Sequence, residues 1–368
     1  MPVRHSLGGG GTCRQPALKS KVVNLVRLRR KRYESISILS FAAQRKDFLM
    51  SSYKTAESVS PKHPDKLCDQ ISDAILDAYL ALDPDARVAI EAAGGHGQVF
   101  VLGEVTAKHK VDIEPIVKRL AGDVELRTKI VHQSPEIASG VDTGGAGDQG
   151  IMVGYATSET KELLPLEVVL ARQLNQYLYK RWPNDGKTQI TLKDSKIVAL
   201  VASFQHAKSN DLQMAIGDWL KDKSHAGKVA IYANPAGEWD QGGFDADSGL
   251  TGRKLVIDNY GPQTPVGGGC FSGKDATKVD RSGAYMARRI AVDYLKKHKA
   301  GEVYCYLAYA IGVAEPLEAV IRIDSGTHEV KGYNLTPKGI IDYLDLKKPQ
   351  YEQTARYGHF GHGFAWDD

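Results

Sequence analysis

The sequence is poor in cysteine and has no long apolar run. Four cysteines in 368 residues are too few for a disulfide framework and too widely spaced for a CxxC metal clip. This usage favours a reducing, cytoplasmic location. No stretch of about eighteen apolar residues occurs, so we expect no membrane-spanning segment. Residues with the spacing of a nucleophilic Ser-His-Asp or Cys-His set, or of a zinc site, are also missing.

Acidic residues are scarce in only one segment. Residues 1–49 contain eleven basic and two acidic side chains, a charge of +9, whereas the whole chain has a formal net charge of +4. The remainder is therefore at −5, and overall basicity does not indicate a nucleic-acid-binding protein. We interpret residues 1–49 as a basic leader that is disordered or not part of the mature protein. A targeting peptide and a nucleic-acid-binding arm are the alternatives.

Beyond the leader, short strand patterns alternate with longer helical patterns, which predicts an α+β fold. Three segments of similar length are joined by short glycine-rich linkers. The predicted strands cover 98–105 and 196–204, with two more between 303 and 323. The predicted helices cover 163–182, 211–222, 280–299 and 337–346.

A further predicted helix lies at the start of this region. Apolar residues repeat at helical spacing from Leu67 to Leu82, and Pro64 occupies the favoured first turn. Asp69, Asp73 and Asp77 repeat every four residues along it. Because such a stripe of like charges repels itself, we expect it to lie on a solvated face.

A glycine-rich loop at 267–275 is the first candidate for chemistry. Gly268 and Gly273 have the P-loop spacing and Lys274 follows, but Asp275 stands where a P-loop has the Ser or Thr that binds magnesium. Free backbone N–H groups beside a lysine still suit a phosphate. We interpret the loop as a phosphate cradle that does not belong to an ordinary P-loop NTPase. A flexible surface loop is the alternative.

Charged residues gather around this loop. Cations at fixed loop positions with interspersed carboxylates suit a polyphosphate that is held together with a divalent metal. A basic solvated face is the alternative. The cations are Arg253, Lys254, Lys274, Lys278 and Arg281, and the carboxylates are Asp247 and Asp280.

Two other motifs carry weaker signals. In His63-Pro64-Asp65-Lys66, Asp65 falls in the first helical turn, where the helix dipole favours its ionised form and leaves it available as a metal ligand. A simple helix cap is the alternative. The glycine-rich segment 144–150 suits a loop that moves or approaches a ligand closely. The remaining histidines of note, which we expect to be structural or solvated, are His359 and His362.

In combination and in this order, these segments resemble the S-adenosylmethionine synthetase family, also called the methionine adenosyltransferases. The resemblance extends from Glu57 to Gly361 and is carried by five segments: 63–66, 145–150, 249–254, 267–275 and 278–282. It implies three intertwined α/β domains of similar build, at 52–137 (N-terminal), 145–241 (central) and 243–368 (C-terminal). It also implies a homodimer or homotetramer with active sites at the dimer interface. We expect neither nucleic acid nor a membrane as a partner.

The resemblance further implies that the substrates are ATP and L-methionine and that the cofactors are Mg2+, with two ions per site, and K+. The family forms S-adenosylmethionine by displacement at the ribose 5′ carbon and then hydrolyses the tripolyphosphate to phosphate and diphosphate. A thioether sulfur has no proton to lose, so the displacement needs neither a general base nor a protein nucleophile. The protein must orient the reactants and neutralise a highly charged leaving group, which fits the cations described above.

The resemblance also assigns roles to individual residues. Catalytic roles are expected for His63, which would assist departure of the triphosphate, and for Arg253 and Lys274. Trp239 stands where the family usually has a phenylalanine against adenine, and it keeps a stacking face. ATP contacts are expected from these four residues and from Asp185, Lys187, Asp247, Lys254 and Cys270. Methionine contacts are expected from Glu104, Gln133, Asp247 and Lys278. The expected Mg2+ ligands are Asp65 and Asp280, and the expected K+ ligand is Glu91.

The chain departs from the family pattern at several positions. Lys62 replaces a glycine, which we expect to add a charge beside the phosphate site, and Cys270 replaces an alanine. Segments 114–133 and 140–147 are shorter than in familiar bacterial members, and the second belongs to the loop that covers the active site. We therefore expect altered closure kinetics with unchanged chemistry.

Two rival hypotheses remain. Another ATP-dependent phosphotransferase with the same glycine–lysine loop would yield a phosphorylated product. A non-catalytic regulatory homologue would have lost ligands, yet His63, Asp65, Lys274 and Asp280 are all present.

Overall fold

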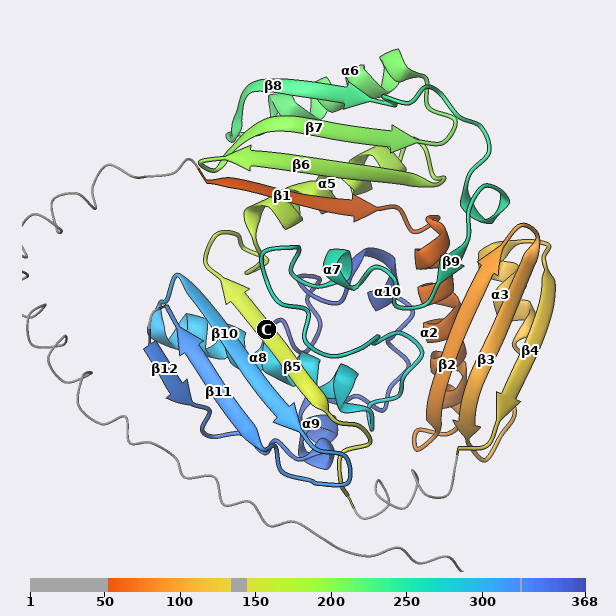
Figure 1. The fold of residues 1–368 in the computed structure, drawn as a ribbon, viewed down its shortest axis with the longest axis vertical. Helices are drawn as coiled ribbons and strands as arrows, with labels where there is room; N and C mark the ends of the chain where they lie inside the picture. The colour runs from red at the N-terminus through yellow and green to blue at the C-terminus, as the bar shows by residue number, and fades with distance from the viewer. Residues whose placement is uncertain (1–51, 134–143, 325) are drawn as a thin grey trace, which may run out of the picture. The chain divides into compact units, whose positions relative to one another are not determined.

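A computed structural model describes residues 52–133, 144–324 and 326–368 of the chain. The basic leader, Cys13 and the first half of the shortened segment 140–147 lie outside the described residues, and so do the predictions made for them. Within the described part, the backbone forms three four-stranded sheets, each with helices packed against it (Figure 1). No helix in this part is long and apolar enough to cross a bilayer.

The N-terminal sheet has the strand order β4-β3-β2-β9. Helix α2 (Pro64–Leu82) packs against β2 and β9, and helix α3 (Glu114–Ala121) packs against α2. Alternate residues of β2 and β3 are buried against α2, so the opposite face of the sheet is open. The strands are β2 (Arg87–Gly95), β3 (Gln98–Thr106), β4 (Glu125–Val131) and β9 (Gly249–Leu250).

The central sheet has the order β1-β6-β7-β8 and its own hydrophobic core. Helix α5 (Leu166–Tyr179) packs against β1 and β6, and helix α6 (Ser209–Lys221) packs against β8. Trp219 of α6 is buried in this core. The strands are β1 (Tyr53–Val59), β6 (Gly186–Lys193), β7 (Lys196–Phe204) and β8 (Ala226–Ala233).

The C-terminal sheet has the order β12-β11-β10-β5. Helix α8 (Val279–His298) lies across β5 and β10, and helix α9 (Pro337–Leu344) packs on α8. Its strands are β5 (Gly150–Thr157), β10 (Glu302–Tyr309), β11 (Glu318–Ile323) and β12 (Gly326–Glu329).

Each sheet borrows one strand from a distant part of the chain. Strand β1 pairs with β6 of the central sheet, β5 pairs with β10 of the C-terminal sheet, and β9 pairs with β2 of the N-terminal sheet. Figure 1 shows this as a red-orange strand beside green ones and a yellow strand beside blue ones. The predicted intertwined α/β fold is therefore confirmed.

The long predicted elements are confirmed with shifts of a few residues at their ends. Helix α3, the shortest helices and strands β1, β2, β4, β5, β6, β8, β9 and β12 were not predicted. The shortest helices have four residues or fewer, too few to show a helical period. They are α7 (Leu255–Asp258) and α10 (Thr354–Tyr357), together with the 3-10 turn at Gly243–Asp245.

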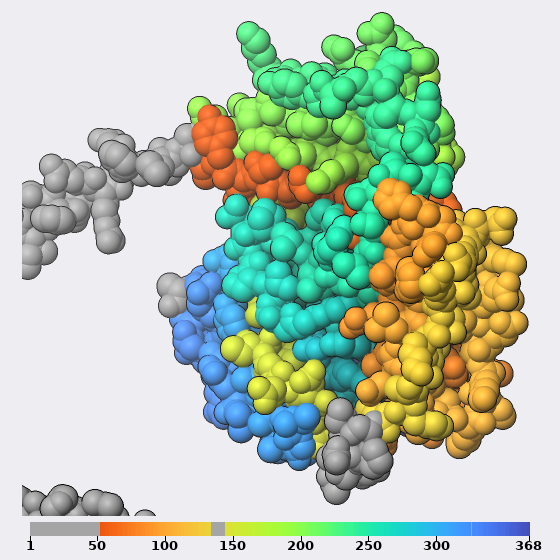
Figure 2. Space-filling view, turned by 45° about the vertical axis from the view of Figure 1, so that its right-hand side comes forward, coloured from red at the N-terminus to blue at the C-terminus, as the bar shows by residue number. Residues whose placement is uncertain are grey.

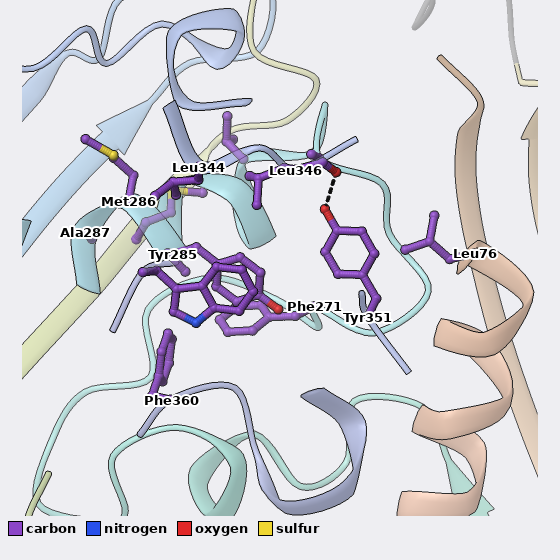
Figure 3. Close-up of a cluster of buried hydrophobic side chains, with 14 of the residues drawn as sticks. Leu76, Phe271, Tyr285, Met286, Ala287, Leu344, Leu346, Tyr351 and Phe360 are labelled. Carbon is purple, nitrogen blue, oxygen red and sulfur yellow. Dashed lines mark hydrogen bonds between the residues drawn. The ribbon is translucent and has the colours of Figure 1, made fainter. Parts of the chain in front are cut away.

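The glycine–lysine loop is anchored in the core by an aromatic side chain. Phe271 lies between Gly269 and Gly273 of the loop. It is buried and makes an edge contact with Tyr285 of α8 at 5.9 Å between ring centroids. Tyr285 in turn stacks on Trp366 at 3.8 Å. Nearby, the Tyr351 hydroxyl donates to Leu346 O at 2.5 Å (Figure 3). The middle of the loop is thus fixed, which disfavours the flexible-loop alternative.

The expectation of a solvated aspartate stripe on α2 is wrong. Asp69 and Asp73 are buried, and Asp77 is half-buried. Asp73 receives a two-pronged ion pair from Arg281 at 2.7 and 2.9 Å, and Asp77 accepts backbone N–H groups from residues 350–352. Repulsion along the stripe is offset because each carboxylate has a donor from another part of the chain.

Removal of the Asp73 carboxylate is expected to destabilise the fold. In Asp73→Ala, Arg281 stays buried without its counter-ion, so we expect the free energy of unfolding to fall by about 3–5 kcal/mol. Equilibrium urea denaturation, followed by tryptophan fluorescence, measures this loss. The control, Asp342→Ala, removes one partner of the exposed pair with Lys338 and should cost under about 1 kcal/mol. Equal losses in the two variants would contradict the structural role of Asp73.

Candidate active site

His63 forms the N-terminal cap of α2. Its Nδ1 accepts the backbone N–H of Asp65 at 3.1 Å, and Pro64 occupies the first turn. The helix-cap interpretation is therefore correct for His63. Because Nδ1 is an acceptor, the proton of the neutral ring lies on Nε2. Burial, together with the nearby Lys254 ammonium, lowers the pKa of His63 to about 4, so the imidazole is neutral at pH 7.

Asp65 forms ion pairs with two cations from a segment almost 190 residues away. Arg253 Nε lies 2.9 Å from Asp65 Oδ1, and Lys254 Nζ bonds to Oδ2. The backbone N–H of Leu250 also donates to Asp65, at 3.0 Å. Burial opposes ionisation, but Lys254 and this N–H group hold the pKa of Asp65 below its usual range. Strand β9 brings these residues together by pairing with β2.

Other predicted nucleotide residues surround this group. Lys187 and Asp247 are close enough to His63 to influence its pKa, and Lys187 also pairs with Glu57 at 3.3 Å. Asp185 Oδ2 accepts the N–H of Gly243 at 3.1 Å, and burial raises the pKa of Asp185. The structure therefore brings this predicted set into one region of the chain. The segment that carries β9 and α7 lies at the surface between the orange and blue parts of the molecule (Figure 2).

A second group forms on the glycine–lysine loop. Lys274 Nζ lies 2.6 Å from Asp280 Oδ2, and the N–H of Gly269 donates to the other carboxylate oxygen at 3.3 Å. A Cβ on Gly268 would lie 2.7 Å from Asp280 Oδ1. The loop therefore needs glycine here because its backbone approaches a carboxylate closely.

Asp275 and Lys278 pair with each other. Lys278 is almost fully buried, and its Nζ bonds to Asp275 Oδ1. Asp275 also accepts the N–H of Val88 at 2.7 Å and the Thr277 hydroxyl at 2.6 Å. Its position in the P-loop-like pattern therefore serves to attach the loop to β2. The expected contact of Lys278 with substrate stays a prediction.

The open face of the N-terminal sheet carries three predicted residues, Glu91, Glu104 and Lys274. Ala89 pairs with Glu104 on one side and forms an isolated bridge with Lys274 on the other, so these three positions are in register. Paired positions of antiparallel strands share a face, and Glu91 shares it as well, two residues from Ala89. Gln133 comes two residues after the end of β4, the strand that pairs with β3 next to Glu104. The residues expected to contact methionine (Glu104), K+ (Glu91) and phosphate (Lys274) thus lie along one surface.

Helix α2 connects the two groups. Asp69 accepts the N–H of Gly252 at 2.8 Å, and Asp73 accepts the N–H of Gly273 at 2.8 Å. Cys270 lies against Gly252, where a Cβ would be only 2.7 Å from its sulfur. The role of Asp69 and Asp73 was not predicted. Their four-residue spacing was the signal, and it was interpreted as solvent exposure.

Two lysines near the cap contact residues that are distant in the sequence. Lys62 Nζ donates to Leu120 O at the end of α3, at 3.2 Å, so its charge complements that helix terminus. The expected position of this charge beside the phosphate site stays a prediction. Lys66 is fully buried between Asp69 and Asp258, at 3.0 and 2.6 Å, and this is a structural role.

The C-terminal histidines have structural or solvated positions, as expected. His359 is buried and its Nδ1 shares a 2.9 Å hydrogen bond with the Tyr285 hydroxyl. His362 lies at the surface.

The carboxylates fit a hard divalent cation. Asp65 and Asp280 each face a lysine ammonium and supply carboxylate oxygens, which are the ligands that a hard cation prefers. In the part of the chain that the structure describes, no three His, Cys, Asp or Glu side chains converge on one point. This donor set suits Mg2+, which binds through one or two carboxylates plus phosphate oxygens.

Comparison with known proteins agrees with this geometry. Three family models match in order: the S-adenosylmethionine synthetase N-terminal domain at residues 51–141, the central domain at 143–239 and the C-terminal domain at 241–368. The chain is 40% identical over 369 residues to an S-adenosylmethionine synthase of Desulforudis audaxviator (strain MP104C), which covers 84% of this chain and 93% of that protein. An S-adenosylmethionine synthase of Staphylococcus epidermidis is 40% identical over 372 residues, with 83% and 92% covered. From residue 51 to its end, the chain belongs to the S-adenosylmethionine synthetase family.

Proposed function

We propose that the groups around Asp65 and Asp280 form the substrate site of a methionine adenosyltransferase. The chain forms S-adenosylmethionine from ATP and L-methionine. The observation that carries the residue assignment is the joining of Asp65 to Arg253 and Lys254 by the short strand β9. Cations and carboxylates that are far apart in sequence meet there beside a neutral histidine.

In the proposed mechanism, the methionine sulfur attacks the ribose 5′ carbon and the triphosphate leaves. No residue has to remove a proton from the sulfur. His63 is neutral, and its Nε2–H can donate a hydrogen bond to the departing oxygen. Arg253, Lys254 and Lys274 neutralise charge on the triphosphate, and such fixed cations stabilise developing charge without reorganisation. The same cations hold the tripolyphosphate for its hydrolysis to phosphate and diphosphate.

Asp65 and Asp280 would hold Mg2+, which screens the phosphate charge when it is bound. Each carboxylate faces a lysine ammonium, and Asp280 also accepts the N–H of Gly269. Glu91, on the open sheet face, would hold K+. The supporting observation for both assignments is the donor chemistry, since hard cations prefer oxygen ligands.

The methionine pocket is assigned to Glu104 and Gln133, with Asp247 and Lys278 where methionine meets the nucleotide. Glu104 is half-buried and lies in register with Lys274 across Ala89, a separation of two strands or roughly 10 Å. This spacing suits an amino acid that lies next to a phosphate chain. Trp239 and Asp185 are assigned to the adenosine part of ATP.

We further propose that two copies of the chain assemble at the open sheet faces. Phe100 and Leu102 of β3 and Leu250 of β9 are between 40% and 47% exposed on the N-terminal sheet, beside the assigned site residues. Exposed apolar residues in such a patch favour a protein interface.

The unpaired thiols of Cys68, Cys270 and Cys305 support a cytoplasmic location.

The central prediction concerns the product. Purified protein with ATP, L-methionine, Mg2+ and K+ should yield S-adenosylmethionine, phosphate and diphosphate, as measured by mass spectrometry and phosphate release. A phosphorylated product that forms in place of S-adenosylmethionine would favour the rival phosphotransferase. Omission of Mg2+ should abolish turnover, because the triphosphate charge is then only partly neutralised.

A second prediction tests the metal assignment. Asp280→Asn should lower kcat by about 10²-fold or more while the protein stays folded, because the carboxylate that faces Lys274 is lost. Steady-state kinetics and thermal melting measure the two effects. Asp218→Asn, on the exposed surface of α6, is the matched control and should leave both unchanged. Near-normal turnover of Asp280→Asn would remove this residue from the metal site.

A further inference from the structure

Gln205 lies where the two assigned adenosine contacts meet. It follows the last residue of β7 and is half-buried. Its backbone N–H donates to Asp185 O at 3.0 Å, and its side-chain Oε1 accepts the N–H of Asp185 at 3.3 Å. One residue therefore holds both backbone polar groups of Asp185.

The other end of the same amide holds the loop that carries Trp239. Gln205 Nε2 donates to Asp240 O at 2.8 Å. A Cβ on Gly242 would lie 2.6 Å from Gln205 Oε1 and 2.7 Å from Cζ3 of Trp239, so the amide, this glycine and the indole are in close contact. The loop is closed by Gly243, whose N–H donates to the Asp185 carboxylate at 3.1 Å.

The next residue strengthens this arrangement. His206 has a φ of +64°, a left-handed conformation that is uncommon for residues other than glycine. Its N–H donates to Trp239 O at 2.9 Å, and its Nδ1 lies 3.2 Å from the Asp240 carboxylate. Backbone strain of this kind persists where the surrounding contacts fix it.

We propose that Gln205 is a positioning residue that fixes the Asp185 carboxylate relative to the Trp239 indole and so determines the affinity for ATP. The proposal rests on the assignment of Asp185 and Trp239 to ATP made above. Only a side chain with a donor and an acceptor on one planar group can satisfy both Asp185 N–H and Asp240 O. A glutamate keeps the acceptor but turns a carboxylate oxygen toward a carbonyl. A leucine loses both hydrogen bonds at similar volume.

The test compares Gln205→Leu, Gln205→Glu and the control Gln213→Leu, which replaces an exposed glutamine of α6. We expect KM for ATP to rise about ten-fold in Gln205→Leu, the effect of losing one to two hydrogen bonds. KM for methionine and kcat at saturating ATP should stay within about two-fold, and Gln213→Leu should match the wild type. Gln205→Glu should also raise KM for ATP, because it loses the bond to Asp240 O. It keeps the acceptor for the Asp185 N–H, so it still tests the proposal if the leucine variant folds poorly.

The outcomes separate this proposal from the function on which it rests. If Trp239→Ala and Asp185→Asn raise KM for ATP and both Gln205 variants do not, the positioning role is wrong and the site assignment stands. If none of these four variants changes KM for ATP, the assignment of the adenosine contacts fails. An equal rise in both KM values, with a lower melting temperature, would show that Gln205 only supports the fold.

Discussion

The structure depends on one set of interactions, the carboxylates of α2 with backbone N–H groups of distant loops. Asp65, Asp69 and Asp73 bind the N–H groups of Leu250, Gly252 and Gly273, each at 2.8–3.0 Å. A hydrogen bond from a backbone N–H group to a carboxylate is charge-assisted and strong. It fixes the main chain of the loop whatever side chain the loop residue carries. Glycine-rich loops, which have few side chains to anchor them, are held in place in this way.

This constraint also distributes charge in the site. The region beyond the leader has a net charge of −5, yet the loops that α2 fixes carry Arg253, Lys254 and Lys274. Asp65 of α2 and Asp280 of α8 lie beside these cations and offset their mutual repulsion, so that the cations can gather at the proposed polyphosphate site. The same surroundings keep His63 neutral, since burial and Lys254 both disfavour its protonation.

Much of the fold could be predicted because long elements show their period in the sequence. The α2, β7 and α8 segments are examples. The role of the glycine–lysine loop as a phosphate cradle stays a prediction. The aspartates of α2 were misinterpreted because spacing alone cannot distinguish a carboxylate in water from one that faces an N–H group of another segment. The hydrogen bond of Lys62 could not be predicted for the same reason, since Leu120 O is 58 residues away.

By itself the sequence determined the family, the long helices, some of the strands and the residue types available for chemistry, because these follow from motifs and local periodicity. Only the tertiary structure decided which strand joins which sheet and which side chains meet. Strand β9 has only two residues and no period of its own, yet its pairing with β2 accompanies the placement of Arg253 and Lys254 on Asp65. Gln205 likewise carries no motif, and its importance arises from two loops that converge on one amide. Non-local hydrogen bonds set these positions, and no short window of sequence contains both partners.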